Sequence, residues 1–494
     1  MRVALLSSEA VPFAKTGGLG DVAGALPKAL REAGGDVDAV LVHPLYRETK
    51  RELIRERVFD NLEVDWLGQT HRASVFYSEA AGAPAFLVDA PEYFDRAGVY
   101  GHRDDHERFA FFCRAAVALL RRLGAPPDVV HLNDWPGGFG AVELLMRRSR
   151  GDTFFARTRT LFSIHNLAYQ GAFGLDDLWR LGFGSPEERG YFELDGAASA
   201  LKAGLAAGDA LSTVSRRYSH EIQTPEHGNG LDWLLRMRRE RLVGITNGVD
   251  YDVWNPSTDP HLAAHFSADD LEGKRYCKLD LLRRFSRPED LSRPVVASIS
   301  RLTPQKGFGL IRRAAGAILD TGAYLVSLGS GAREYEDFFQ SLRDRAPRQV
   351  GFYRGFNEPL AHQIEAGADI FLMPSQYEPC GLNQMYSMRY GTVPVVRATG
   401  GLDDTVEHFD RSRGTGNGFK FGRYDAGAML ESVYEALYCY AEPDVWRRLQ
   451  QNGMRADHSW QNAARRYVEL YRFAASGRVA GFHVKSLRRT FEHE

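Results

Sequence analysis

Short apolar and β-branched runs alternate with amphipathic stretches through most of this 494-residue chain. The alternation is typical of βα units, in which each strand of a parallel sheet is followed by a helix that covers it. The runs fall into two series, at residues 3–7, 37–42, 129–132, 160–164, 210–214 and 242–245, and at 294–300, 324–328, 350–354, 369–373 and 393–396. We therefore predict an α/β protein with two Rossmann-like, doubly wound domains that face each other across a cleft.

A stretch of turn-forming residues at 247–260 separates the two series. It predicts an N-terminal Rossmann-like domain over residues 1–248, with an inserted β-rich segment near 58–88, and a C-terminal Rossmann-like domain over residues 249–458. Residues 459–475 are expected to form a C-terminal helix, and residues 476–494 are expected to form a basic tail.

Composition excludes several classes of protein. The 62 Lys and Arg residues nearly balance 64 Asp and Glu residues, so the net charge of −2 offers no general attraction to nucleic acid or to an anionic membrane. No window approaches the roughly 18 apolar residues that a membrane span needs. Four cysteines stand far apart without a CxxC pair, which favours a reducing compartment, and we expect the cytoplasm.

The first strand is followed by a glycine-rich loop, Lys15-Thr16-Gly17-Gly18-Leu19-Gly20-Asp21, that leads into a helix. Glycines let a ligand approach the backbone, and a helix N-terminus favours an anion or an electronegative oxygen. The spacing Gly18-x-Gly20-x-x-x-Gly24 superficially matches a dinucleotide-binding loop, which needs its first glycine directly after the strand. Eight residues lie between Ser8 and Gly17, which disfavours nicotinamide binding and leaves a helix entry without ligand as a plainer alternative.

Strand ends in the second half carry groups that suit a diphosphate and a sugar. Arg301 ends a strand and Lys306 follows in a tight Pro/Gly loop, so a guanidinium fork and a point charge stand near the same sheet edge. Glu378 follows a later strand and can accept hydrogen bonds from sugar hydroxyls, while amides of the next helix can hold phosphate. Each of these residues, taken singly, also fits a solvated surface. A further glycine loop at 399–402 follows the next strand.

Five motifs in this order resemble those of the glycogen and starch synthase family, which has the two-Rossmann GT-B glycosyltransferase architecture. They are KTGGLGDV from Lys15, NGVDYDVWNP from Asn247, SRLTPQKG from Ser300, EPCGLNQ from Glu378 and TGGLDDTV from Thr399, and they span nearly the whole chain. The resemblance implies a retaining glucosyltransferase that moves glucose from ADP-glucose to the 4-hydroxyl at the nonreducing end of an α-1,4-glucan such as a glycogen primer. It implies no cofactor and no metal, an acceptor-side N-terminal domain and a nucleotide-sugar-binding C-terminal domain. It also implies that the C-terminal helix at residues 459–475 packs back across the domains.

The same resemblance assigns roles to individual residues. Lys15 is expected to contact the donor phosphate or sugar, Arg301 and Lys306 to neutralise the diphosphate, Glu378 to hold glucose or ribose hydroxyls, and His165 to lie against the transferred glucose. Asp134 is placed at the acceptor side and Phe356 at the base-stacking position, although the family usually has histidines where Asn133 and Pro136 stand. The other expected substrate-binding residues belong to the same motifs: Gly17, Gly18, Asp21, Asn166, Asn247, Cys380, Gly381, Leu382, Thr399, Gly400 and Gly401.

Three patterns favour other chemistry. Asp36-Val37-Asp38 and Asp250-Tyr251-Asp252 resemble the metal-binding DxD of the other glycosyltransferase fold. Residues 414–420 resemble the pyridoxal-phosphate lysine segment of α-glucan phosphorylases, whose other motifs are missing. Tyr386 stands where many glycosyltransferases of this architecture carry the second carboxylate of a Glu-x7-Glu pair. An α-glucan phosphorylase-like enzyme and an inactive glucan-binding protein of the same fold are therefore the alternatives.

Overall fold

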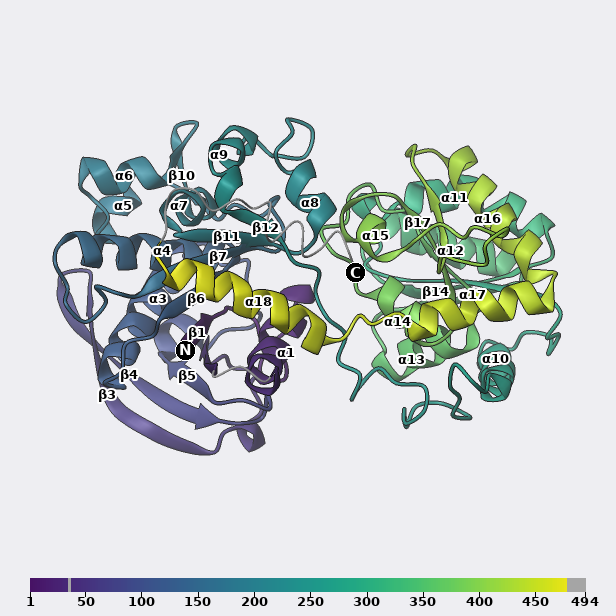
Figure 1. Ribbon diagram of the computed structural model, residues 1–494, viewed down its shortest axis with the longest axis horizontal. Coiled ribbons are helices and arrows are strands. Elements are labelled where there is room, and N and C mark those ends of the chain that lie inside the picture. Colours follow the sequence, from purple (N-terminus) through teal and green to yellow (C-terminus); the bar gives the residue numbers. More distant parts are fainter. Residues whose placement is uncertain (34–36, 478–494) are drawn as a thin grey trace. The chain divides into compact units, whose positions relative to one another are not determined.

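The computed structural model describes residues 1–33 and 37–477 (Figure 1). The described residues divide into two compact units, one formed by Met1–Gly248 together with residues 460–477, and the other by Val249–Ser459. Except for residues 476 and 477, the expected basic tail lies outside the described residues. Among the described residues, no helix combines a bilayer-spanning length with a sufficiently apolar sequence.

The first unit is built on a nine-stranded sheet in the order β12-β11-β7-β6-β1-β2-β5-β4-β3. Its strands are parallel from β12 to β5, whereas β4 and β3 run antiparallel to their neighbours. The β-rich segment that we interpreted as an insertion therefore extends the main sheet. The strand bounds are β1 (Arg2–Leu6), β2 (Asp38–Pro44), β3 (Glu56–Trp66), β4 (Gln69–Ser78), β5 (Ala85–Asp89), β6 (Val129–Asn133), β7 (Arg159–Ile164), β11 (Ala210–Thr213) and β12 (Leu242–Gly244).

Helices and a small second sheet complete the first unit. Helix α18 (Trp460–Ala475), the last helix before the described residues end, packs against α1 (Gly18–Glu32) and the strands β6 and β7 (Figure 1). Its packing across both domains stays a prediction. The other elements are α2 (Pro91–Phe94), α3 (Asp105–Arg122), α4 (Asp134–Ser149), α5 (Asp177–Arg180), α6 (Pro186–Phe192), α7 (Ala200–Ala207), α8 (Arg216–Glu221), α9 (Asp232–Met237), and the short strands β8 (Ala172–Phe173), β9 (Glu193–Leu194) and β10 (Ala197–Ser199).

The second unit is built on a six-stranded, all-parallel sheet in the order β15-β14-β13-β16-β17-β18. Its strands are β13 (Val295–Ile299), β14 (Tyr324–Gly329), β15 (Val350–Arg354), β16 (Ile370–Met373), β17 (Val393–Arg397) and β18 (Phe419–Phe421). Its helices are α10 (Glu272–Arg284), α11 (Phe308–Asp320), α12 (Arg333–Arg345), α13 (Glu358–Gly367), α14 (Asn383–Arg389), α15 (Gly400–Thr405), α16 (Ala426–Tyr440) and α17 (Pro443–Arg455).

Helices cover both faces of this second sheet, which explains why its strands read as continuous apolar runs. Successive side chains of a strand point to opposite faces. Val296 of β13 therefore joins the core formed with α11, α12 and α16, whereas its neighbours Val295 and Ala297 join the core formed with α10 and α13. All eleven predicted strands are confirmed, with ends that differ by at most two residues.

Each sheet has a point at which the strand order reverses. In the first sheet β1 lies between β2 and β6, and in the second β13 lies between β14 and β16. At such a switch point the loops that leave adjacent strands diverge to opposite faces, which opens a crevice at the carboxyl ends of the strands. These two edges are where the fold offers room for ligands.

The close approach of α4 to α7 supplies a test of this packing. A Cβ atom added at Gly138 of α4 would lie 1.8 Å from the carbonyl oxygen of Ala200. We expect Gly138→Ala to destabilise the protein by roughly 2–3 kcal/mol, because the two backbones must separate. At the exposed Gly190 of α6 an added Cβ meets nothing within 4 Å, so Gly190→Ala is the matched control and should be neutral or stabilising by up to about 1 kcal/mol. Thermal unfolding of both variants checks the difference, and equal effects would contradict the close helix contact.

Candidate functional site

A buried carboxylate holds the glycine-rich loop at the end of β1. Oε2 of Glu9 accepts hydrogen bonds from the backbone N–H groups of Thr16 and Gly17, at 2.6 and 2.8 Å. Its other oxygen accepts from the hydroxyl of Tyr100 at 2.9 Å. The sequence prediction missed Glu9, whose one signal is that it lies three residues past a strand that faces the switch point. The carboxylate fixes the backbone course that leads into α1.

The loop held by Glu9 presents an open surface. Added Cβ atoms at Gly17 and Gly18 would meet nothing within 4 Å, so a ligand can approach the backbone there. Lys15 is half-exposed, and its Nζ lies 2.7 Å from Oδ1 of Asp21 in the first turn of α1. The four predicted residues of this loop are therefore together, with one cation and one anion at a helix start.

Asp134 links the loops that follow β6 and β7. It adopts a left-handed conformation with φ of 51°, which is uncommon for a residue other than glycine and is typical of a functional turn. Its Oδ1 accepts hydrogen bonds from the backbone N–H groups of His165 and Asn166, at 2.7 and 3.3 Å. Burial raises the pKa of the Asp134 carboxyl to about 7. The three predicted residues of this edge thus form one hydrogen-bonded group.

The imidazole of His165 is also buried, and burial lowers its pKa to about 3, so the ring is neutral at physiological pH. Its Nε2 lies 2.9 Å from Oδ1 of Asn133. Asn247, near the end of the first unit, is buried, and its Oδ1 finds no hydrogen-bond partner among the described residues.

In the second unit the predicted Lys306 and Glu378 meet at the β13–β16 switch point. The Lys306 ammonium lies 2.5 Å from Oε2 of Glu378, which also accepts a hydrogen bond from Ser375 at 3.1 Å. Glu378 is buried, with 5% of its surface exposed. Sequence reasoning missed Ser375, because a lone serine in a loop has no distinguishing pattern.

Close backbone contacts bring the loops after β13, β16 and β17 together. Gly307 has φ of 78° and lies against the Pro374 carbonyl, where an added Cβ would be 1.9 Å from the oxygen. Gly400 has φ of 46°, and its added Cβ would be 1.8 Å from the Glu378 carbonyl oxygen. The N–H of Gly401 donates to that same carbonyl at 3.1 Å. Glycine is required at these positions because a side chain would force the loops apart.

The remaining predicted residues of the second unit differ in exposure. Arg301 is exposed, and its guanidinium forms no ion pair or side-chain hydrogen bond with any described residue. Phe356 is 76% exposed, as a ring that stacks on a ligand would be. Cys380 and Thr399 are buried in the joined loops, and Gly381 and Leu382 are partly exposed there.

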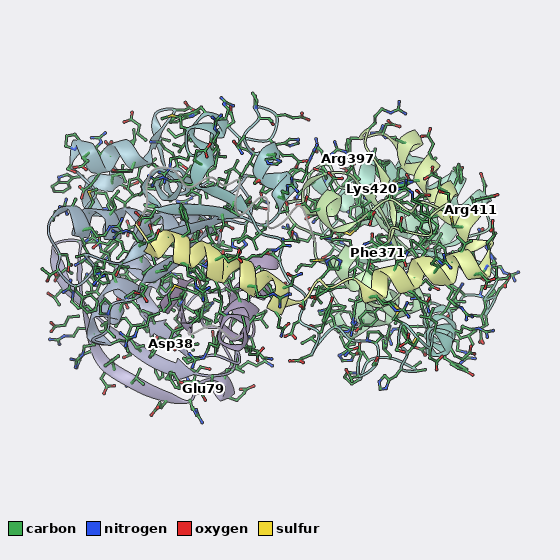
Figure 2. All side chains as sticks on the ribbon, viewed as in Figure 1. Asp38, Glu79, Phe371, Arg397, Arg411 and Lys420 are labelled. Atoms are coloured by element: carbon green, nitrogen blue, oxygen red, sulfur yellow. The ribbon has the colours of Figure 1, made fainter. Side chains whose placement is uncertain are left out.

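Charged residues of the DxD and pyridoxal-phosphate patterns form hydrogen bonds and ion pairs within the protein. Asp38 forms an ion pair with Arg31 at 2.5 Å, and Asp36 lies outside the described residues. Oδ1 of Asp250 accepts the N–H of Asp252 at 2.9 Å in a local turn. Lys420 of the second unit, labelled in Figure 2, pairs with Asp403 of α15 at 2.9 Å. Within residues 1–33 and 37–477, no three His, Cys, Asp or Glu side chains gather as metal ligands would.

Two α/β units with mainly parallel sheets, each with polar loops at its switch point, are the architecture of the GT-B class of glycosyltransferases. Residues 2–237 match the starch synthase catalytic domain family and residues 282–453 match the glycosyl transferases group 1 family. A glycogen synthase of Anaeromyxobacter dehalogenans is 45% identical over 493 residues, which covers 97% of this chain and 100% of the relative. A glycogen synthase of Geobacillus thermodenitrificans is 42% identical over 486 residues, covering 95% and 97%.

Comparison with solved structures gives the same fold. The catalytic domain of starch synthase IV from Arabidopsis thaliana, bound to ADP and acarbose, superposes with a TM-score of 0.88 at 32% identity, covering 96% of this chain and 99% of that one. Sucrose-phosphate synthase from Thermosynechococcus elongatus shares the fold, with a TM-score of 0.61 at 19% identity and coverage of 96% and 98%. The chain belongs to the glycogen and starch synthase family, and it is a glucosyltransferase of glycogen synthesis that uses a nucleotide-sugar donor and a glucan acceptor.

The raised pKa of Asp134 predicts a pH dependence of stability. A carboxyl whose folded pKa is about 7 rather than 3.8 favours the protonated form in the folded state, so its contribution to stability falls as pH rises from about 4 to 7. Asp134→Asn keeps an oxygen that can accept from His165 and Asn166 but carries no charge. We therefore expect the melting temperature of the variant, relative to wild type, to be higher at pH 8 than at pH 5. A difference that stays constant with pH would place the carboxyl pKa in its ordinary range.

Proposed function

We propose that the protein transfers glucose from ADP-glucose, with retention of the anomeric configuration, to the 4-hydroxyl at the nonreducing end of an α-1,4-glucan. The observation that carries the proposal is the pairing of Lys306 with Glu378 at the switch point where Arg301, whose guanidinium is unpaired among the described residues, follows β13. Together they offer two cations for a diphosphate and a carboxylate for sugar hydroxyls at one switch point. The related starch synthase bound to ADP and acarbose supports this choice of donor and acceptor.

The chemical task of the second unit is electrostatic. As the bond between the sugar C1 and the phosphate oxygen lengthens, negative charge grows on the ADP leaving group and the sugar becomes oxocarbenium-like. The Arg301 fork and the Lys306 ammonium stabilise the diphosphate. Once Lys306 turns toward phosphate, the Glu378 oxygen that it contacts is released to accept hydrogen bonds from hydroxyls of the glucose or ribose.

The first unit supplies the sugar-side contacts in this proposal. Lys15 contacts the donor phosphate or sugar, and the open backbone at Gly17 and Gly18 leaves space for it. His165 lies against the transferred glucose, and Asp134 shapes the acceptor side by holding the loop that carries His165. The assignment follows the family motifs and the position of these residues at the first switch point.

Retention needs no carboxylate nucleophile in this scheme. The acceptor 4-hydroxyl attacks C1 on the face from which ADP departs, the C1–O bond to phosphate breaks, and the leaving phosphate takes the hydroxyl proton. The products are ADP and a glucan longer by one glucose. The exposed Phe356 ring is suited to stack on adenine. A cytoplasmic location also belongs to this proposal, and the four free cysteines are consistent with a reducing compartment.

Glucose incorporation into a glycogen primer tests the donor and the linkage. We expect label from ADP-glucose to enter the glucan faster than label from UDP-glucose, with α-1,4 linkages by NMR and with activity that is insensitive to EDTA. β-linkages, or activity abolished by EDTA and restored by manganese, would overturn the mechanism. Release of glucose 1-phosphate from glycogen and phosphate would favour the phosphorylase alternative, and no transfer at all would favour a glucan-binding protein.

The role of the two cations has its own test. Removing one charge that stabilises the leaving group should cost roughly 2–4 kcal/mol of transition-state energy, or about 10²- to 10³-fold in kcat, for Arg301→Ala and for Lys306→Ala. The KM for glucan should change little. Lys50→Ala is the matched control, because Lys50 is an exposed lysine of the first unit outside the proposed site. A Lys306→Ala enzyme with near wild-type kcat would show that Lys306 is a solvated surface cation.

A further inference from the structure

The side chain of Asn133 connects three neighbouring strands at the first switch point. Asn133 ends β6, and its Cα pairs in register with Ser163 of β7, two residues before His165. Its side chain is 1% exposed and forms two hydrogen bonds. Nδ2 donates to the carbonyl oxygen of Leu6, the last residue of β1, at 3.0 Å. Oδ1 lies 2.9 Å from Nε2 of His165.

The contact with Leu6 determines which way the amide is turned. A backbone carbonyl can only accept a hydrogen bond, so the NH₂ group of Asn133 must face Leu6 and its oxygen must face His165. An amide oxygen is likewise only an acceptor. The ring of His165 must therefore donate through Nε2, which means that Nε2 carries the proton.

The other ring nitrogen of His165 is then left as an acceptor. The ring is neutral, because burial lowers its pKa to about 3, and a neutral imidazole has a single N–H. Nδ1 consequently carries a lone pair, and it forms no hydrogen bond with any described residue. The backbone of His165 is held separately by Asp134, so two consecutive residues fix both the main chain and the ring.

We propose that Asn133 is a positioning residue that holds His165 as the neutral tautomer protonated at Nε2, so that Nδ1 accepts a hydrogen bond from a hydroxyl of the transferred sugar. The identity of that ligand rests on the proposed function, whereas the tautomer is a property of the free protein. Asn133 does not itself contact substrate in this scheme; it acts through His165.

The direction of this hydrogen bond matters for the chemistry. A sugar hydroxyl that donates to Nδ1 gains electron density on its oxygen, which favours an oxocarbenium-like transition state on the same ring. The opposite tautomer would donate an N–H to that hydroxyl and withdraw electron density, and an imidazolium would add a repulsive positive charge. Asn133 thus selects the one form of His165 that assists the developing cation.

NMR of the free protein with ¹⁵N-labelled histidine tests the tautomer without any substrate. The signals of His165 are identified by their loss in His165→Gln. We expect the wild-type ring to be protonated at Nε2 between pH 6 and pH 9, and we expect Asn133→Leu, which is close in size but has no amide, to lose this single form. A wild-type ring protonated at Nδ1, or an unchanged tautomer in Asn133→Leu, would overturn the proposal whatever the enzyme transfers.

Steady-state kinetics with the donor and glucan then test whether Asn133 acts through His165. We expect Asn133→Leu to lower kcat about tenfold, the effect of one neutral hydrogen bond, with the KM for glucan within about twofold of wild type. In a His165→Gln background the same change should cause no further loss. A full, additive loss in the double variant would show that Asn133 has only a structural role.

Thr213→Val is the matched control for stability. Thr213 is fully buried on β11 of the same sheet, and its hydroxyl donates to the Ile164 carbonyl at 2.9 Å. The variant should lower the melting temperature to a degree comparable with Asn133→Leu and leave the His165 tautomer and kcat unchanged. An equal loss of kcat in Thr213→Val would mean that loosening this sheet, rather than the Asn133 contact, reduces activity.

Discussion

The reversal of strand order in each sheet is the constraint on which both candidate sites depend. Parallel strands all deliver their carboxyl ends to one edge, and the loops diverge only where the order reverses. The buried strands β1 and β6 lead to Glu9 and Asp134, and β13 and β16 lead to Arg301 and Glu378. The strand order of each sheet therefore determines where polar residues can lie close together, and the residue types in the loops determine which ligands they can bind.

Lysine is rare in this chain, and two of the lysines occupy positions where a compact ammonium makes specific contacts. Arg supplies 53 of the 62 cations. The buried Lys274 donates to the carbonyl oxygens of Ala366 and Tyr390 and to the hydroxyl of Thr392, at 2.9, 2.8 and 2.7 Å. A compact ammonium can reach three acceptors at one point, whereas a planar guanidinium cannot. Lys306 differs from Lys274 in that its ammonium contacts a single acceptor, Oε2 of Glu378.

Periodicity and turn chemistry predicted the strands well because each buried strand carries its own apolar signal. They could not predict β18, which has three residues and follows glycines. Motif spacing and position at strand ends predicted Lys306 and Glu378 as site residues. Glu9 and Ser375 were missed, because the role of a single polar residue depends on which distant N–H or carboxylate it contacts after folding. The orientation of an amide such as Asn133 likewise emerges only when three strands lie side by side.

The ion pair between Lys306 and Glu378 neutralises two of the three charged groups that we predict at the second site, and the Arg301 guanidinium remains without an ion-pair partner in the described part of the chain. A small free anion that approached Lys306 would have to separate this pair and would leave a buried carboxylate with only Ser375 as a partner, which is costly. A ligand with both phosphate oxygens and hydroxyl donors can satisfy both members at once. Separation of Lys306 from Glu378 is therefore favoured by a ligand that brings phosphate oxygens and hydroxyl groups in one molecule.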